Sequence, residues 1–265
     1  MNGKQYRLKR IFNQKTNKTI LLPMDHGMTM GPISGIEDVN DTLEVIAKSK
    51  VNAVLLQKGL VNNCNVQKLN NNQAVVMHLS ANTMLNPNAG YKAIIATVED
   101  ALVGGCDAVS VHLNIGDDFE TNMLKEIGRV SSACERYGMP LIAMVYARGN
   151  LIKDEYAVDK VMHAARVGAE IGADIVKVNY TGSIDTFSEV VKGCPIPVVI
   201  AGGSKTDSEE DILRMVNDAI IAGAAGISIG RNIFQSKNML SLLDRIDNIV
   251  TKNACGANLN CSKIA

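Results

Sequence analysis

The chain has 265 residues, of which 46% are hydrophobic, and its 27 basic residues balance its 27 acidic residues. This length and composition suit one large α/β domain or two small ones with a fully buried core. Zero formal charge argues against a nucleic-acid partner or an anionic membrane surface. No apolar run approaches the ~18 residues of a membrane-spanning helix, and the N-terminus lacks the apolar segment of a secretory signal. With six scattered cysteines and no CxxC pair, the sequence predicts a cytoplasmic protein with reduced thiols.

Eight short runs of β-forming residues alternate with helical patterns along the chain. The predicted strands are 19–25, 52–57, 74–79, 108–114, 141–146, 174–180, 197–203 and 226–231. The clearest helical patterns between them are 121–137, 157–171, 208–222 and 238–252. Eight strand–helix units over about 250 residues predict a single α/β domain, a (β/α)8 TIM barrel. We assign the barrel to residues 1–252, and we expect residues 253–265 to be a mobile C-terminal tail.

A doubly wound sheet is the alternative fold. Such sheets usually carry a glycine-rich phosphate loop after an early strand, and no GxGxxG follows the first predicted strand here. The Asn-rich stretch 62–73 is predicted to be a loop after the second strand. Because the loops that follow barrel strands build the site, we expect this stretch to border it.

Polar residues gather at the predicted carboxyl ends of the strands, where a TIM barrel carries its functional groups. The first strand ends in Asp25-His26-Gly27, and the fifth ends in Tyr146-Ala147-Arg148. Lys177 lies within the sixth, in the stretch ADIVKVNYTG. Because alternate residues of a strand share a face, Lys177 is predicted to face the barrel interior while Val176 and Val178 face the helices. The same alternation turns other polar residues inward, namely His78, Ser80, Ser110, His112, Asn114 and Asn179.

A buried lysine is costly unless it is paired or loses its proton. Desolvation lowers the pKa of a lysine, and a neutral amine can attack a carbonyl carbon to form a Schiff base. Lys177 is therefore a candidate nucleophile, and a structural Lys–carboxylate pair is the alternative. Asp25 and Tyr146 would supply the proton transfers that Schiff-base aldol chemistry requires. Each also has a structural interpretation, Asp25 as a turn residue and Tyr146 as a core aromatic with a solvated hydroxyl.

The seventh and eighth strands are followed by glycine-containing turns. Gly202 and Gly203 follow one strand, and Gly230 and Arg231 follow the other. Barrels frequently bind phosphate in these two loops through backbone N–H groups, and an arginine adds a bidentate contact. The alternative is that the glycines only shape tight turns. The pair of turns predicts a phosphate site.

These residues lie in stretches that resemble the archaeal-type class I aldolase family. The family includes fructose-bisphosphate aldolases and 2-amino-3,7-dideoxy-D-threo-hept-6-ulosonate synthases, and the second half of this chain is most similar to the synthases. The resemblance extends from about residue 7 to about residue 250. The stretches that carry it are PMDHG (23–27), MVYARG (144–149), ADIVKVNYTG (173–182), VVIAGGSKT (198–206) and GAAGISIGRNIFQ (223–235).

The resemblance implies a role for each matching residue. Lys177 matches the Schiff-base lysine, Tyr146 the proton donor and Asp25 the proton acceptor. The segments that match those holding the phosphorylated sugar are Asp25 to Thr29 (with His26, Gly27 and Met28), Tyr146 to Arg148 (with Ala147), Gly202 with Gly203, and Gly230 with Arg231. The implied reaction joins a unit from 6-deoxy-5-ketofructose 1-phosphate to L-aspartate semialdehyde, on an alternative route to 3-dehydroquinate and aromatic amino acids. No cofactor or metal is implied, and a homo-oligomer such as a decamer is expected.

Two departures from the family bear on the substrate. Relatives often have Tyr-Pro-Arg where this chain has Tyr146-Ala147-Arg148, and Gly-Gly-Pro-Lys where it has Gly202-Gly203-Ser204-Lys205. Neither removes a catalytic group. Fructose-bisphosphate aldolase therefore remains the alternative activity. A metal-dependent aldolase would need converging histidine and carboxylate ligands, and a non-catalytic sugar-phosphate-binding barrel would have no need of the three reactive residues.

Overall fold

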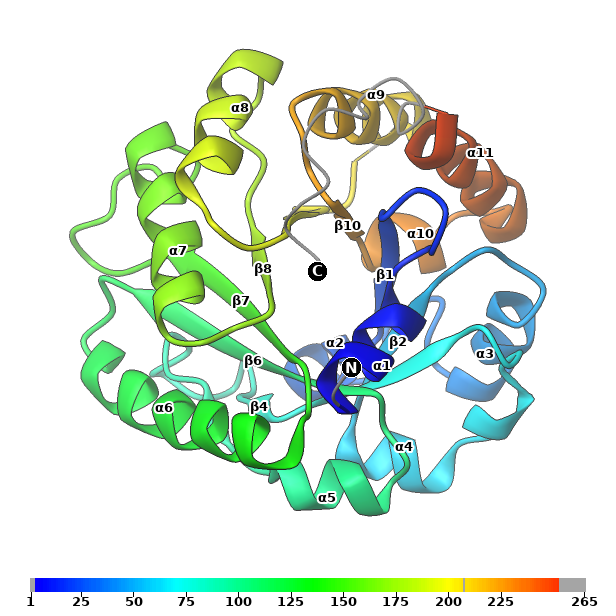
Figure 1. Cartoon of the computed structure of the whole chain (residues 1–265), viewed down its shortest axis with the longest axis horizontal. Helices are drawn as coiled ribbons and strands as arrows, with labels where there is room; N and C mark the ends of the chain where they lie inside the picture. Colours follow the sequence, from blue (N-terminus) through cyan, green and yellow to red (C-terminus); the bar gives the residue numbers. More distant parts are fainter. Residues whose placement is uncertain (1–2, 207, 253–265) are drawn as a thin grey trace.

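Eight parallel strands close into a barrel that is enclosed by helices (Figure 1). The computed structural model describes residues 3–206 and 208–252, so the predicted tail 253–265 lies outside the described residues. The order around the barrel is β1-β10-β9-β8-β7-β6-β3-β2. The barrel strands are β1 (Thr19–Pro23), β2 (Ala53–Gln57), β3 (Ala74–His78), β6 (Ala108–Ile115), β7 (Leu141–Ala147), β8 (Ile175–Val178), β9 (Val198–Ala201) and β10 (Gly226–Ser228). The predicted TIM barrel is confirmed, and the doubly wound sheet is excluded.

The helices of the outer ring agree with the sequence patterns where those patterns are long. The ring contains α3 (Val39–Ile46), α5 (Val98–Val103), α6 (Glu120–Tyr137), α7 (Val158–Glu170), α8 (Ile184–Gly193), α9 (Glu209–Ile221) and α11 (Met239–Lys252). The four helices predicted explicitly, α6, α7, α9 and α11, agree within one residue at each end. Shorter elements were not predicted: α1 (Gly3–Ile11), α2 (His26–Met30), α4 (Lys58–Asn63), η1 (Val66–Lys68), α10 (Arg231–Phe234) and the hairpin of β4 (Ser80–Ala81) and β5 (Ala93–Ile94).

Local chemistry sets the helix boundaries. Thr97 and Asp100 form a capping box at the start of α5, which satisfies N–H groups that lack a partner within the helix. α6 ends where Gly138 adopts the left-handed conformation (φ 60°) and donates from its N–H to the carbonyls of Cys134 and Glu135. Of the helices in the described part of the chain, none is long and apolar enough to cross a membrane.

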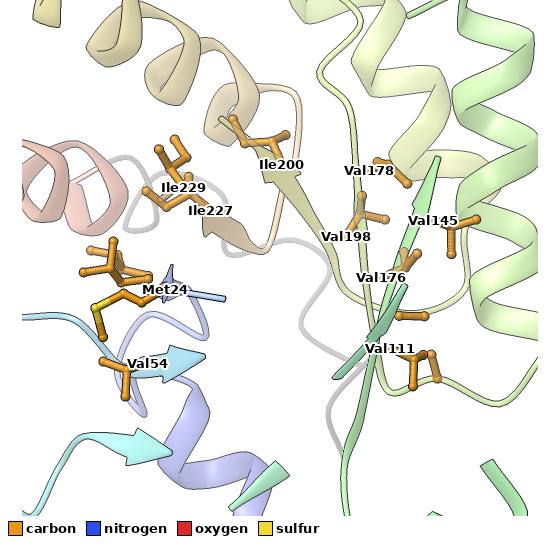
Figure 2. Close-up of a cluster of buried hydrophobic side chains, with 14 of the residues drawn as sticks. Met24, Val54, Val111, Val145, Val176, Val178, Val198, Ile200, Ile227 and Ile229 are labelled. Atoms are coloured by element: carbon orange, nitrogen blue, oxygen red, sulfur yellow. The ribbon is translucent and has the colours of Figure 1, made fainter. Parts of the chain in front are cut away.

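Strand alternation divides the core into two layers. Residues such as Val176, Val178 and Val198 point outward and pack against the helices (Figure 2). Their neighbours Ile175 and Val199 point into the barrel and belong to a separate interior cluster. Both faces of each strand are therefore covered, which explains why the strands read as nearly continuous apolar runs.

The barrel interior is apolar at its amino end and polar at its carboxyl end. Ile11 and Phe12, at the end of α1, pack among the interior residues of the strands and fill the amino end. The Thr19 hydroxyl donates to the Ile11 carbonyl at 2.7 Å and fixes α1 to the first strand. The inward polar residues lie toward the other end, as predicted for His78, Ser80 and His112. The fold thus leaves its carboxyl end open for chemistry.

The Asn-rich stretch 62–73 does not line the polar cavity at that end, although its Cys64 lines a neighbouring cavity. It contains the end of α4, the short helix η1 and the connection that enters β3 from its amino side. Gln73 donates from Nε2 to the Ile46 carbonyl at 2.7 Å, and Arg10 of α1 donates to the Asn71 carbonyl at 3.4 Å. The prediction was wrong because this segment is mainly a helix-to-strand connection, and such connections lie at the amino ends of barrel strands.

Candidate active site

A cavity of about 290 Å³ opens at the carboxyl end of the barrel. Its walls come from the ends of the strands and from the segments that follow them. Ten of the residues predicted from sequence line it: Asp25, His26, Thr29, Tyr146, Arg148, Lys177, Gly202, Gly203, Gly230 and Arg231. The structure therefore brings together groups that are separated by more than 200 residues in the chain.

Lys177 lies in β8 with its side chain directed into the cavity, and the residue is 7% exposed. Burial lowers its pKa to about 8, while the negative charge of Asp25 acts in the opposite direction. In the described part of the chain no carboxylate lies close enough to form an ion pair with Lys177, so the structural-pair interpretation does not hold. With a pKa of about 8, roughly one Lys177 side chain in ten is a neutral amine at pH 7. Such an amine can act as a nucleophile.

Asp25 follows β1 and precedes α2. Its carboxylate oxygens lie 3.5 Å from His26 Nδ1 and 3.6 Å from His78 Nε2. Burial favours a raised pKa, but His78, His26 and Lys177 outweigh it and leave the pKa of Asp25 lowered. Burial also lowers the pKa of both histidines, while the charge of Asp25 acts in the opposite direction. Among the described residues, no group of three or more His, Cys, Asp or Glu side chains is arranged to hold a metal ion.

Tyr146 lies in β7, which adjoins β8 and stands opposite β1 in the barrel. Lys177 pairs in register with Met144, so Tyr146 projects on the same face as Lys177, two residues nearer the carboxyl end. Its ring centre is 5.1 Å from the His112 ring and 4.5 Å from the Arg148 guanidinium carbon. Burial raises the pKa of the phenol. Tyr146 therefore keeps its proton and is suited to donate it.

The loops after β9 and β10 form one bonded unit. Arg231 donates to the Gly203 carbonyl at 2.9 Å. Asn232 donates from Nδ2 to the carbonyls of Gly202 and Ser204, each at 3.0 Å, and its Oδ1 accepts from the Thr206 N–H at 2.8 Å. These bonds place two glycine turns and a guanidinium at one wall of the cavity, beside Lys177. The arrangement suits a phosphate group.

Gly230 is required by packing. A Cβ at this position would lie 2.5 Å from His26 Cε1 and 2.7 Å from the Pro23 carbonyl oxygen. No side chain fits that space without moving the segment that carries Asp25. The glycine therefore allows the β10 loop to approach the end of β1.

Three predicted residues do not line the cavity. Ala147 packs in the layer between strands and helices, because its neighbours Tyr146 and Arg148 take the inward positions. Gly27 and Met28 line a neighbouring cavity of about 470 Å³. The chain enters α2 directly after Asp25, and the helical turn directs these two residues away from Lys177.

Two charged cavity residues were not predicted from sequence. Glu155 accepts from Arg148 Nε at 2.6 Å and from Asn179 Nδ2 at 3.1 Å. Lys92 donates from Nζ to Asn82 Oδ1 at 2.6 Å. Both lie in connecting segments, where no strand or helix period indicates which way a side chain points. Their only signal was a charge in a segment that follows a barrel strand.

A parallel barrel with a buried, unpaired lysine between a phenol and a carboxylate defines a class I aldolase, which works through a lysine Schiff base. Residues 19–236 match the DeoC/LacD family of aldolases, and the chain belongs to this family. The resemblance noted from sequence is thereby confirmed.

Similar proteins agree with this assignment. The chain is 43% identical over 253 residues to 2-amino-3,7-dideoxy-D-threo-hept-6-ulosonate synthase 1 of Archaeoglobus fulgidus, covering 96% of this chain and 93% of that protein. It is 34% identical over 248 residues to 2-amino-4,5-dihydroxy-6-oxo-7-(phosphonooxy)heptanoate synthase of Streptomyces griseus, covering 94% and 90%. A solved Schiff-base-forming fructose-1,6-bisphosphate aldolase superposes with a TM-score of 0.87 at 30% identity, covering 93% of this chain and 99% of that one.

Proposed function

We propose that the chain is a transaldolase that makes 2-amino-3,7-dideoxy-D-threo-hept-6-ulosonate from 6-deoxy-5-ketofructose 1-phosphate and L-aspartate semialdehyde. The observation that carries the proposal is the buried Lys177 amine, which has no ion-pair partner in the described chain and shares its cavity with Tyr146 and Asp25. The name of the Archaeoglobus fulgidus relative supports this product. The family resemblance places the product on the alternative route to 3-dehydroquinate and aromatic amino acids.

The product fixes which donor carbonyl reacts. Its carbon 7 is a methyl carbon next to the ketone at carbon 6, so the transferred unit is the unphosphorylated methyl end of the donor. The neutral Lys177 amine therefore attacks the C5 ketone. Asp25 transfers a proton from the attacking nitrogen to the new carbinolamine oxygen. Tyr146 then protonates the hydroxyl as it leaves as water, and the Asp25 carboxylate stabilises the iminium ion that remains.

Cleavage breaks the bond between donor carbons 3 and 4. The Tyr146 phenolate takes the proton of the C3 hydroxyl, C3 becomes an aldehyde, and the bonding electrons move into the iminium ion to give an enamine. A phosphorylated three-carbon aldehyde departs. The enamine carbon then attacks the aldehyde of L-aspartate semialdehyde, and Tyr146 returns the proton to the new alkoxide. Water hydrolyses the product iminium ion and restores the amine and the phenol.

A second donor class is favoured by the position of the glycine loops. β8, β9 and β10 are consecutive around the barrel, so Gly203 and Arg231 lie beside Lys177. A phosphate there would belong to the fragment that stays on the lysine, as it would for dihydroxyacetone phosphate or fructose 1,6-bisphosphate. The Streptomyces griseus product, which carries a 7-phosphonooxy group, has its phosphate at that position. Fructose-bisphosphate aldolase activity is thus the second candidate.

Borohydride trapping tests both candidates. The protein is incubated separately with 6-deoxy-5-ketofructose 1-phosphate and fructose 1,6-bisphosphate, reduced, and analysed by intact mass and peptide mapping. The expected result is an adduct on Lys177 that forms at lower concentration with the first sugar, and none in a Lys177→Met control. More efficient trapping of the bisphosphate would select the second candidate. Folded protein that forms no adduct with either sugar would rule out the proposed chemistry for these donors.

Assembly and location belong to the same proposal. The family resemblance implies a homo-oligomer, such as a decamer, acting in the cytoplasm. Exposed apolar side chains beside the site, Met84 (65% exposed) and Leu85 (94% exposed), are consistent with a subunit interface. Sedimentation velocity is expected to give one species of about ten subunits, and a monomer would contradict this assembly.

A further inference from the structure

Three cations of the cavity, Lys92, Lys177 and Arg231, form no ion pair with a carboxylate of the described residues. The lining contains Lys92, Arg148, Lys177 and Arg231 but only two carboxylates, Asp25 and Glu155. Glu155 forms an ion pair with Arg148 at 2.6 Å. The charge of Asp25 acts on both Lys177 and Lys92 without forming an ion pair with either, and Lys177 is the proposed nucleophile. Lys92 and Arg231 are therefore available for anionic parts of the substrates.

These two cations stand on opposite walls. Arg231 follows β10, beside Lys177. Lys92 directly precedes β5, whose hairpin with β4 follows β3, and β3 lies opposite β9 in the barrel order. The antiparallel register pairs Ala81 with Ala93, so Asn82 lies across from Lys92 and accepts a hydrogen bond from its Nζ at 2.6 Å. A second bond, from Asn82 Nδ2 to the Ala89 carbonyl at 2.8 Å, holds the amide itself in place.

The surroundings of Lys92 suit a residue that binds a ligand better than a residue with only a structural role. The side chain is half-buried and lines the cavity. Its hydrogen-bond partner is a neutral amide, which fixes the position of the ammonium group without neutralising it. Its charge also contributes to lowering the pKa of His112, whose ring lies beside Tyr146. The positive charge is thus held near the proton donor, on the wall away from the glycine loops.

We propose that Lys92, positioned by Asn82, binds the anionic end of the aldehyde that exchanges during the reaction. This inference rests on the proposed function and names its substrate subsite. The departing aldehyde leaves the same carbon of the Lys177-bound unit that the arriving aldehyde then joins. The two aldehydes therefore occupy the same side of the cavity in turn. One carries a phosphate and the other a carboxylate at its far end. A single lysine ammonium group can bind either group.

The test separates this subsite from the Schiff-base chemistry. Hydroxyacetone has no anionic group, so its borohydride trapping on Lys177 should be unchanged in Lys92→Met, which also shows that the variant is folded. The concentration of 6-deoxy-5-ketofructose 1-phosphate that gives half-maximal trapping should rise about 10- to 100-fold, as expected for loss of a charge-assisted hydrogen bond. Lys92→Arg should recover part of this loss. Lys125→Met, an exposed lysine on α6, should behave as wild type.

The acceptor half is measured with two aldehydes. With the donor at saturating concentration, the KM for L-aspartate semialdehyde should rise about 10- to 100-fold in Lys92→Met. The rate with propanal, which has no carboxylate, should stay within about twofold under the same condition. An equal loss with both aldehydes, or impaired hydroxyacetone trapping, would make Lys92 a general positioning residue and overturn the proposal. Unchanged values for both anionic substrates would also overturn it. Failure of the wild-type protein to trap any ketone would instead refute the proposed function.

Discussion

The two ends of the barrel differ in what their interiors contain. At the amino end, Ile11 and Phe12 are 0% and 4% exposed and pack among the apolar interior residues. At the carboxyl end, Lys177 is 7% exposed, and the groups around it are imidazoles, a phenol and a carboxylate. The first end is arranged for burial of apolar surface, and the second keeps an ionisable amine away from water. Stability and reactivity are therefore located at different ends of the same strands.

The comparison predicts opposite effects for substitutions at the two ends. Removing the amine should abolish turnover and relieve an unfavourable burial. Removing an aromatic ring from the amino end should lower stability and leave the chemistry intact. The experiments below are ordered from the largest expected effect to the smallest.

Lys177→Met should lower kcat by at least about 10⁵-fold, because it removes the amine that forms the Schiff base. At pH 7 the free energy of unfolding should rise by about 1–3 kcal/mol, since a buried ammonium ion is replaced by an apolar chain of similar length. Steady-state rates and urea unfolding measure the two quantities. Substantial turnover in this variant would assign the nucleophile to another residue.

Tyr146→Phe should lower kcat by about 10²–10⁴-fold, the usual contribution of general acid–base catalysis. The fold should be retained, because the ring and its contact with His112 remain. Borohydride should still trap a ketone on Lys177, but more slowly. A variant with wild-type kcat would show that the phenol transfers no proton in the slow step.

Phe12→Ala should reduce the free energy of unfolding by about 3–5 kcal/mol, the usual cost of removing a buried aromatic ring. The kcat of the folded fraction should stay within about twofold, because the substitution lies at the end of the barrel away from the cavity. Tyr6→Ala is the control on α1, the helix that ends just before Phe12. Tyr6 is 63% exposed, so its loss should change stability by no more than about 0.5 kcal/mol.

The pH profile gives the smallest effect. Because Lys177 has a pKa of about 8, kcat/KM should rise about tenfold per pH unit below that value and level off above it. The free energy of unfolding should also depend on the protonation of Lys177. Between about pH 8 and about pH 10.5 the unfolded chain binds a proton that the folded chain has lost, so the stability of the wild type should increase with pH relative to Lys177→Met. A flat difference across this window would mean that Lys177 titrates normally.

The sequence predicts much of this arrangement because strand alternation and strand ends carry positional information. Strand alternation places Lys177 and His78 on the inner face, and Gly202-Gly203 and Gly230-Arg231 mark the loops that follow β9 and β10. Ala147 was included through the family segment, although the alternation that turns Tyr146 and Arg148 inward assigns it to the outer face. At this position, strand alternation predicted the direction of the side chain more accurately than the match to the family segment did.

The remaining site residues lie in segments that have no strand or helix periodicity to indicate where a side chain points. The orientation of Lys92 is set by the β4–β5 hairpin, and each of those strands has only two residues. Glu155 lies in the connection before α7, where its partners come from Arg148 and Asn179. Met28 faces another cavity because α2 begins at once after Asp25. For Lys92 and Glu155 a contact with another segment, and not the local sequence, determines where the side chain points.

The bonds made by Asn232 also bear on how this protein can diverge. One amide, 7% exposed, serves three backbone groups of the β9 loop from its position in α10. An insertion or deletion in that loop would leave several buried polar groups without partners, so the two glycine loops should be inherited together. Within residues 3–206 and 208–252, no hydrogen bond joins the hairpin that carries Lys92 to these two loops. A change of substrate is therefore expected to come through new hairpin sequences, while the wall beside Lys177 stays constant.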